Sequence, residues 1–211
     1  MMMENFPDAS SPQYNRRTLT VEDLQMRILM HGDPIHVNKV IDAYEMASTV
    51  HAGKLRNDGT AYFDHIARTA MILMDELRIY DTDMIVAALL HDVLEDSRTV
   101  TRDVLDYNFG SYVAYVVETL TKDLDAAKVD PERVDLYYAE RLRKASQDCL
   151  LIKLAARLDN FRCLSFNLKK NPHLYVSTTL SRYVPIAEAA SDVRLQTLAT
   201  LIRNESNTVL G

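Results

Sequence analysis

The segment from residue 84 to residue 96 combines an apolar run with a dense cluster of ionisable side chains. The run Met84-Ile85-Val86-Ala87-Ala88-Leu89-Leu90 is followed by His91, Asp92, Glu95 and Asp96. In a continuous helix these four polar side chains would share an arc of roughly 140°, with apolar residues on the opposite face. A soluble protein seldom places carboxylates on so apolar a helix without a cation to balance them. We therefore expect a buried helix over residues 82–96 that binds a cation.

The composition favours helices along the whole chain. Its 211 residues are enough for one domain with a sizeable core, and they include only five glycines and six prolines. No run of alternating apolar and polar residues is long enough to predict a strand. We predict an all-α fold, with a flexible lead-in over residues 1–18 and a single compact multi-helix domain over residues 19–211.

Helical periodicity begins near residue 21 and continues almost to the end of the chain. Asp33 and Asp130 each precede a proline, which is typical of an N-cap followed by the first helical position. Pro185 is expected to kink or split the last helix. The charged segment 122–133 is predicted to be a loop at the rim of a ligand pocket. The predicted helices cover residues 21–31, 35–52, 62–77, 82–96, 100–108, 110–121, 131–146, 149–168 and 173–204.

The composition also restricts the classes of partner and the cellular location that we expect for the protein. No uncharged apolar stretch is long enough to span a membrane, and the N-terminus does not resemble a secretory signal. Cys149 and Cys163 fit core thiols in a reducing compartment, so we expect a cytoplasmic protein. The net charge of −6 argues against nucleic acid as the main partner but allows a small phosphorylated ligand. The chain can form oligomers, and the sequence does not decide their size.

His65 is the natural companion of the cluster at 91–96. It lies at the start of the predicted helix over 62–77, just after the turn-like residues 57–60. With His91 and Asp92 it makes a plausible divalent-metal site, since nitrogen and oxygen ligands suit manganese, iron or zinc. Glu95 and Asp96 would lie close enough to act on a water molecule. The alternative is a hydrogen-bonded core histidine beside a solvated acidic face.

Two further segments carry polar groups that suit a phosphorylated ligand. The first includes Lys54 and Arg56, whose cations can hold phosphates or stack on a base. The second, residues 151–162, predicts an amphipathic helix that contains Asp159 and Asn160, both of which are poor residues for a helix interior. For each segment, an ordinary solvent-exposed surface is the alternative.

These segments, in this order, resemble the HD-domain phosphohydrolases. The family pattern runs H-x-x-Q-x-R-x-x-G-x-P-Y-x-x-H-P, then A-A-L-L-H-D-x-x-E-D-T, then K-L-A-D-R-L-x-N-x-R. The matching segments here are residues 51–66, 87–97 and 153–162, and the resemblance spans about residues 38–165. Within the superfamily the chain is most similar to the Rel/SpoT-type guanosine polyphosphate 3′-pyrophosphohydrolases and their small stand-alone relatives.

The resemblance implies a role for each matching position. His65, His91 and Asp92 would bind a manganese ion, and Glu95 and Asp96 would be the catalytic pair that positions and activates the attacking water. In the substrate site, Arg56 would lie against the guanine base, Asn160 would bind the nucleoside, and Lys54 would contact the ligand. The implied reaction converts ppGpp or pppGpp to GDP or GTP and pyrophosphate.

Four positions depart from the family pattern. Lys54 stands in place of Gln, Ala61 and Ile66 stand in place of Pro, and Ala156 stands where the fourth metal ligand, an Asp, is expected. A methyl group cannot bind a metal, and Asp159 is offset from Ala156 by about 60° and 4.5 Å along a helix. We therefore expect weaker metal binding and impaired turnover.

Two hypotheses explain Ala156. One is an engineered Asp-to-Ala change that captures bound substrate, and the other is natural loss of activity in a protein that keeps its pocket. Because the other predicted metal and catalytic residues are all present, we favour the first. Two other functions stay open: an HD phosphohydrolase acting on another nucleotide, and a non-catalytic nucleotide-binding sensor.

Overall fold

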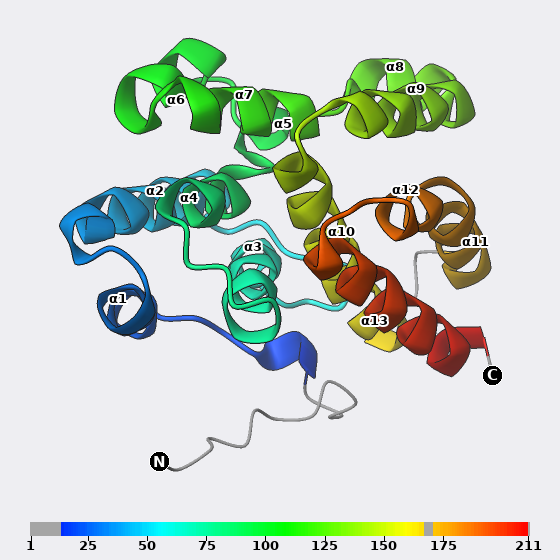
Figure 1. Ribbon diagram of the computed structural model, residues 1–211. Coiled ribbons are helices and arrows are strands. Elements are labelled where there is room, and N and C mark those ends of the chain that lie inside the picture. The colour runs from blue at the N-terminus through cyan, green and yellow to red at the C-terminus, as the bar shows by residue number, and fades with distance from the viewer. Residues whose placement is uncertain (1–13, 167–170, 211) are drawn as a thin grey trace, which may run out of the picture.

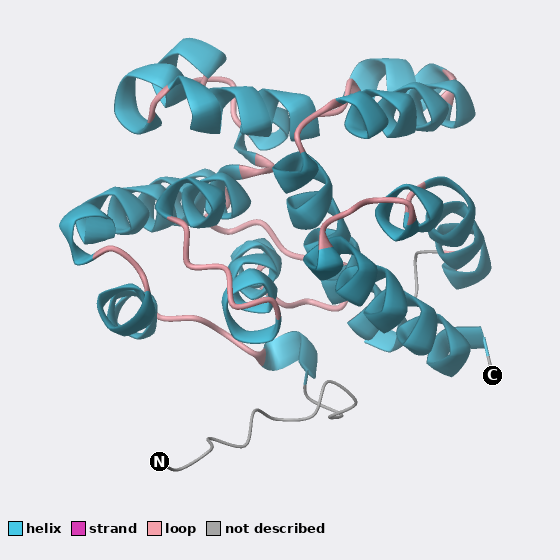
Figure 2. Cartoon of the chain, viewed as in Figure 1, coloured by secondary structure: helices cyan, strands magenta, loops and turns pink. Residues whose placement is uncertain are grey.

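Helices account for most of the chain in the computed structural model, which describes residues 14–166 and 171–210 (Figures 1 and 2). No strand occurs among these residues, and Leu55 and Ala61 form only an isolated antiparallel bridge. The prediction of an all-α fold is confirmed. The α-helices are α1 (Val21–His31), α2 (Val37–Val50), α3 (Tyr62–Met71), α4 (Thr82–Leu90), α5 (Val93–Asp96), α6 (Arg102–Phe109), α7 (Ser111–Leu120), α8 (Leu124–Val129), α9 (Pro131–Lys144), α10 (Gln147–Arg162), α11 (Pro172–Arg182), α12 (Val184–Glu188) and α13 (Val193–Leu210).

Local capping signals explain most helix starts. Thr20 caps α1, and Asp33 and Asp130 accept from backbone N–H groups just ahead of a proline, as predicted. Pro185 stands in the first turn of α12, so the predicted last helix is split between α11 and α12, and a second break separates α12 from α13. Proline lacks the backbone donor that a continuous helix needs at this point. The predicted end of the helix over 149–168 lies partly outside the described residues.

The prediction of a loop over residues 122–133 is wrong for most of the segment. Residues 124–129 form α8, and Pro131 begins α9. The Asp123 side chain accepts from the backbone N–H of Ala126 and so starts a short helix in this charged segment. Of residues 122–133, Lys122 is the one that lines the cavity shared by His65 and His91, as the predicted pocket rim requires.

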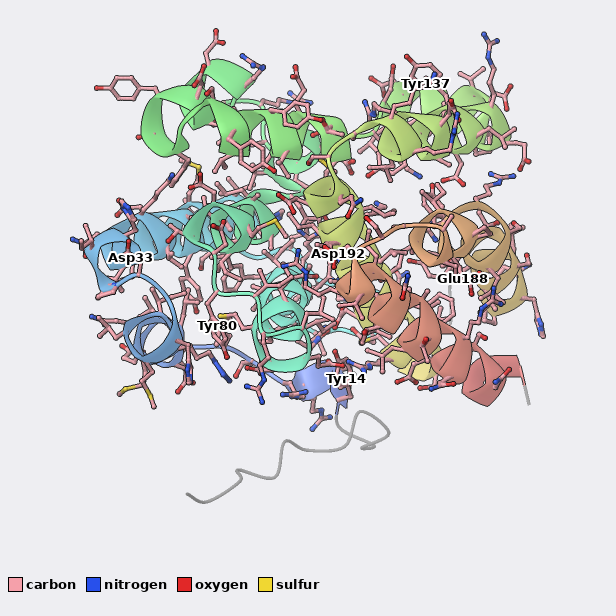
Figure 3. The ribbon with its side chains drawn as sticks, viewed as in Figure 1. Tyr14, Asp33, Tyr80, Tyr137, Glu188 and Asp192 are labelled. Carbon is pink, nitrogen blue, oxygen red and sulfur yellow. The ribbon has the colours of Figure 1, made fainter. Side chains whose placement is uncertain are left out.

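The predicted flexible lead-in is wrong for residues 14–18, while residues 1–13 lie outside the described part of the chain. Tyr14 belongs to a 3-10 turn, η1 (Tyr14–Arg16), and is 1% exposed. Figure 3 places it at the foot of the domain, where the guanidinium groups of Arg68 and Arg162 lie over its ring. Arg68 also donates to the backbone carbonyls of Asn15 and Arg17, which ties this segment to α3.

Two helices organise the core. The residues of α4 from Met84 to Leu90 are buried, and α4 packs against α2, α3 and α7. The longer helix α10 runs through the middle of the molecule and packs against α3 and α13 (Figure 1). The polar groups of the site therefore come from elements that are fixed by apolar packing. Among the described helices, none has the length and apolar character needed to cross a membrane.

Candidate metal centre and nucleotide cavity

The helix predicted over residues 82–96 breaks at its ionisable cluster. Helix α4 ends at Leu90 and the short α5 begins at Val93, so the prediction of one continuous helix is wrong. The ring Nδ1 of His91 lies 2.8 Å from the carbonyl oxygen of Ala88, the same oxygen that a continuous helix would offer to the backbone N–H of Asp92. The side chain thus takes part of the helical hydrogen bonding at the break. As a result, the adjacent residues His91 and Asp92 both reach one cavity.

The three predicted metal ligands lie together. One ligand atom each from His65, His91 and Asp92 can be chosen so that all three lie within 4.8 Å of one another. His65 comes from the first turn of α3, and its ring centroid is 5.6 Å from that of His91. The Nε2 atom of His91 is 3.5 Å from Oδ2 of Asp92. Two imidazoles and a carboxylate at this spacing suit a divalent cation.

The hydrogen bonds of the two imidazoles fit metal binding. A carbonyl oxygen can only accept, so Nδ1 of His91 carries the proton. Nδ1 of His65 lies 2.6 Å from Oδ2 of Asp159, whose pKa is held well below its usual range by Arg68 and His65 despite burial. Both rings therefore present the Nε2 lone pair, the form in which imidazole binds metals.

Electrostatics favour the same ionisation states. Burial lowers the pKa of His65 to about 4, so its ring is neutral near pH 7. Burial opposes ionisation of Asp92, but neighbouring groups, first His91 and His65 and then Lys153 and the hydroxyl of Tyr62, hold its pKa below the usual range. Tyr62 donates to Oδ2 of Asp92 across 2.7 Å. A neutral imidazole and an ionised carboxylate are the forms that bind a cation.

These ligands lie in a cavity of about 400 Å³ whose lining is mainly polar. Its charged lining comprises five cations and, apart from the histidines, two carboxylates. The cations are Lys54, Arg56, Lys122, Lys153 and Arg157, and the carboxylates are Asp92 and Glu95. An excess of cations beside a candidate metal centre suits a ligand with several phosphate charges.

The side chains of Glu95 and Asp96 have different surroundings, although the two residues are adjacent in the sequence. Glu95 lines the cavity, and its Oε1 accepts from the backbone N–H of Lys122 at 2.6 Å. Burial, together with the charge of Asp92, raises the pKa of Glu95 above its usual value. Asp96 instead pairs with Lys54 and lies 3.3 Å from Nδ1 of His51, and it is absent from the cavity lining.

Helix α10 forms one wall of the cavity with a single face. Lys153, Ala156, Arg157 and Asn160 line the cavity at the spacing of one helical stripe. At the position where the family pattern has a fourth ligand, Ala156 offers no donor atom from its side chain. Asp159 lies off this face and is fully buried behind His65.

The predicted nucleoside-binding residues meet at the other end of this stripe. Nη2 of Arg56 donates to Oδ1 of Asn160 at 2.8 Å, and both residues line the cavity. Lys54 also lines it, with its ammonium group 4.2 Å from the ring centroid of Tyr62. The structure therefore brings together Arg56, Asn160 and Lys54 with the candidate metal ligands.

Several residues of the lining were not predicted, namely Tyr62, Lys153, Arg157 and Tyr175. The stripe spacing from Ala156 could have identified Lys153 and Arg157. Lys122 belongs to the segment predicted as the pocket rim, whereas Tyr175 reaches the cavity through packing between distant segments, for which the sequence carries no local signal.

Comparison with known proteins places these features in a family. The HD domain family model matches residues 43–190. The human protein named guanosine-3′,5′-bis(diphosphate) 3′-pyrophosphohydrolase MESH1 is 35% identical over 129 residues, which covers 60% of this chain and 70% of that protein. An Aquifex aeolicus protein named guanosine-3′,5′-bis(diphosphate) 3′-pyrophosphohydrolase is 34% identical over 167 residues, covering 79% of this chain. The match covers 23% of that bacterial protein, so this chain spans less than a quarter of its length.

A solved structure supports the same relationship. It is described as a metazoan ortholog of SpoT that hydrolyzes ppGpp and plays a role in starvation responses. Its fold matches with a TM-score of 0.68 at 26% identity, covering 79% of this chain and 94% of that chain. Together with the family match over most of the chain, these similarities show that the protein belongs to the HD-domain family.

Proposed function

We propose that this chain hydrolyses guanosine 3′-diphosphate alarmones, ppGpp and pppGpp, to GDP or GTP and pyrophosphate. The observation that carries the proposal is the grouping of His65, His91 and Asp92 within 4.8 Å, in a cavity lined by cations. The names of the human and Aquifex relatives support the choice of substrate.

His65, His91 and Asp92 would hold a divalent cation, which we propose to be manganese, although their donor atoms also suit iron or zinc. When bound, such an ion lowers the pKa of a water molecule and neutralises phosphate charge. The free Nε2 atoms of both imidazoles fit this role. Ala156 leaves one family ligand position without a donor, so we propose that the metal is held more weakly than by four protein ligands.

Glu95 is proposed to carry the proton of the attacking water. Its carboxylate lines the same cavity as the proposed metal ligands, and burial and the charge of Asp92 raise its pKa above the usual value, which makes it a stronger base. Asp96, the other member of the proposed catalytic pair, faces Lys54 and His51, so its role rests on the family resemblance.

The remaining lining would bind the nucleotide. We propose that Lys122, Lys153 and Arg157 hold phosphate oxygens, since all three present cations to the cavity. Arg56 would lie against the guanine, and Asn160 would hydrogen-bond the nucleoside. Lys54, which also lines the cavity, would contact the ligand. The partner is thus a small guanosine polyphosphate, and we propose neither nucleic acid nor a membrane as a partner.

A cytoplasmic location is also part of the proposal. Cys149 and Cys163 are both buried and unpaired thiols, which fits a reducing compartment.

The test is release of pyrophosphate from ppGpp by the chain with Ala156, which is the reference protein and is called wild type below for that reason alone, and by Ala156→Asp, each titrated with MnCl₂. We expect Ala156→Asp to release pyrophosphate and GDP at lower manganese concentration and at a higher rate than the wild type. Asp92→Asn in the Ala156→Asp background is the matched control and should be inactive. Absence of manganese-dependent hydrolysis by Ala156→Asp, with the fold intact, would contradict the proposed activity.

Ala156 itself favours a second candidate, a sensor that binds the nucleotide without turnover. Calorimetry with ppGpp separates the two functions. Binding by the wild type that does not require manganese, together with inactivity of Ala156→Asp, would favour the sensor. Restored hydrolysis by Ala156→Asp would favour the enzyme.

A further inference from the structure

Asp159 is a fully buried carboxylate that the proposed reaction does not use. Its exposed fraction is 0%, and its Oδ2 accepts from Nδ1 of His65 at 2.6 Å. The other oxygen, Oδ1, accepts from Nε of Arg68 at 2.5 Å, and Nη1 of Arg56 lies 3.3 Å from Oδ2. A carboxylate with this many donors is held rigidly and stays ionised.

The position of Asp159 prevents direct binding to the candidate metal. The two nitrogens of an imidazole point away from each other, and Asp159 occupies the Nδ1 side of His65. A cation bound by Nε2 would lie on the opposite side of the ring. Asp159 is therefore placed to act on such a cation only through His65.

The charge of the candidate ligand set indicates what Asp159 contributes from its position beside His65. His65, His91 and Asp92 bring one negative charge to a divalent cation, whereas a carboxylate at position 156 would add a second. Asp159, three residues further along α10, keeps a second carboxylate next to the site. An anionic acceptor on the Nδ1–H of a metal-binding histidine fixes the ring and strengthens its Nε2 as a donor.

We propose that Asp159 is a positioning residue that partly compensates for Ala156. It does so by holding His65 in the Nδ1-protonated form and by supplying, through the ring, negative charge that the ligand set lacks. The compensated site would take a divalent transition-metal cation with three protein ligands. This inference rests on the proposed function, because it needs a cation at His65, His91 and Asp92.

A simple Asp159→Asn substitution would leave the buried guanidinium of Arg68 without its carboxylate, and the chain could fail to fold for that reason. The test therefore uses Arg68→Met in both members of a matched pair. Arg68→Met keeps the Asp159 carboxylate on His65. The double variant Arg68→Met with Asp159→Asn keeps an acceptor oxygen but removes its charge. Thermal melting checks that both variants fold.

The first readout is the dissociation constant of Mn²⁺ alone, measured by electron paramagnetic resonance. We expect the double variant to bind Mn²⁺ about 10- to 100-fold more weakly than Arg68→Met. With Ala156→Asp added to both proteins, a carboxylate at position 156 is expected to replace the missing charge, and the difference should fall to about threefold or less.

The second readout is the nitrogen spectrum of His65 in metal-free protein. We expect one protonated Nδ1 and one unprotonated Nε2 in Arg68→Met, and a mixture of the two tautomers in the double variant.

Equal Mn²⁺ affinity within the matched pair, or an equal difference with and without Ala156→Asp, would overturn the inference while leaving the metal site in place. Failure of every variant, including Ala156→Asp alone, to bind Mn²⁺ would overturn the proposed function and the inference together.

Discussion

The C-terminal end of helix α4 and the body of helix α10 both lead polar groups to the cavity, but they do so in opposite ways. Helix α4 is apolar from Met84 to Leu90, where it ends, and the polar residues that reach the cavity follow that end. Helix α10 is continuous from Gln147 to Arg162 and carries its polar groups within the helix. A break allows adjacent side chains to face one site, whereas a continuous helix presents only every third or fourth residue to it.

This difference explains why we expect Ala156 on α10 to weaken metal binding. On the stripe that faces the cavity, the neighbours of Ala156 are Lys153, Arg157 and Asn160, none of which carries an anionic donor. The nearest carboxylate on the helix, Asp159, points behind His65. At the α4–α5 break, by contrast, His91 and Asp92 are adjacent candidate ligands, and Glu95 follows within one turn. Neighbouring polar side chains can therefore face the cavity together at the break, whereas the cavity-facing stripe of α10 has no second carboxylate to replace the missing one.

The largest expected effect is on kcat and concerns the carboxylates that follow the α4–α5 break. In the Ala156→Asp background, Glu95→Gln should lower kcat by about 100- to 10,000-fold, because the proton acceptor in the cavity is lost. Asp96→Asn is the matched comparison, since its carboxylate faces Lys54 rather than the cavity. We expect a smaller loss for Asp96→Asn, measured as pyrophosphate release. A greater loss for Asp96→Asn than for Glu95→Gln would reverse our assignment of the two carboxylates.

The next largest expected effect is on stability; it concerns Lys153 on α10 and depends on pH. Burial, together with Lys122 and Arg157, lowers the pKa of Lys153 to about 7, compared with 10.5 for an ordinary lysine. From about pH 7 to about pH 10 the unfolded chain therefore binds more protons, so the free energy of unfolding of the metal-free protein rises with pH. Lys153→Met should remove this rise, which is at most about 1.4 kcal/mol per pH unit.

Urea denaturation at several pH values measures the slope. Lys144→Met, which removes a largely exposed ammonium group on α9, should keep the wild-type dependence. The same slope in Lys153→Met and in the wild type would contradict the low pKa of Lys153.

A moderate effect is expected at the end of the α10 stripe. Asn160→Ala in the Ala156→Asp background should raise KM for ppGpp by about 5- to 10-fold, the equivalent of one lost hydrogen bond. The control is Asn108→Ala, because Asn108 bonds only to the carbonyl of Val104 on its own helix among the described contacts. Unchanged KM in Asn160→Ala would argue against nucleoside binding at this end of the cavity.

The smallest expected effect is on stability and concerns the N-caps of α4 and α10. Asp81 accepts from the backbone N–H of Met84 and caps α4, whereas the Ser146 side chain makes no capping bond to α10. Asp81→Ala should lower the free energy of unfolding by about 1 kcal/mol. Ser146→Ala should change it by less than about 0.5 kcal/mol. Equal effects in denaturation experiments would show that capping does not distinguish the two helices.

Local signals in the sequence predicted the features that depend on neighbouring residues. The predicted bounds of 21–31 match α1, which in the structure is capped by Thr20 and followed by Gly32. The break at His91 was missed because apolar periodicity continues through it without glycine or proline. Its visible cause, the contact between the His91 ring and the carbonyl of Ala88, is a side-chain interaction that a helical pattern cannot express.

The candidate site, like the fold, has features that local sequence signals predict and features that depend on packing between helices. Motif resemblance predicted that His65 belongs with His91 and Asp92, and the structure brings the three together. The contact of Asp159 with His65 depends on how α3 packs against α10, so spacing along one helix could not predict it.

Anomalous diffraction at the manganese edge, from crystals of the wild type and of Ala156→Asp soaked in MnCl₂, tests the central claim most directly. The account predicts one ion per chain, contacted by Nε2 of His65, Nε2 of His91 and the Asp92 carboxylate in both proteins. Ala156→Asp should add a fourth protein ligand and a higher occupancy at the same soaking concentration. No ion in either crystal, or an ion bound away from these three side chains, would contradict the account.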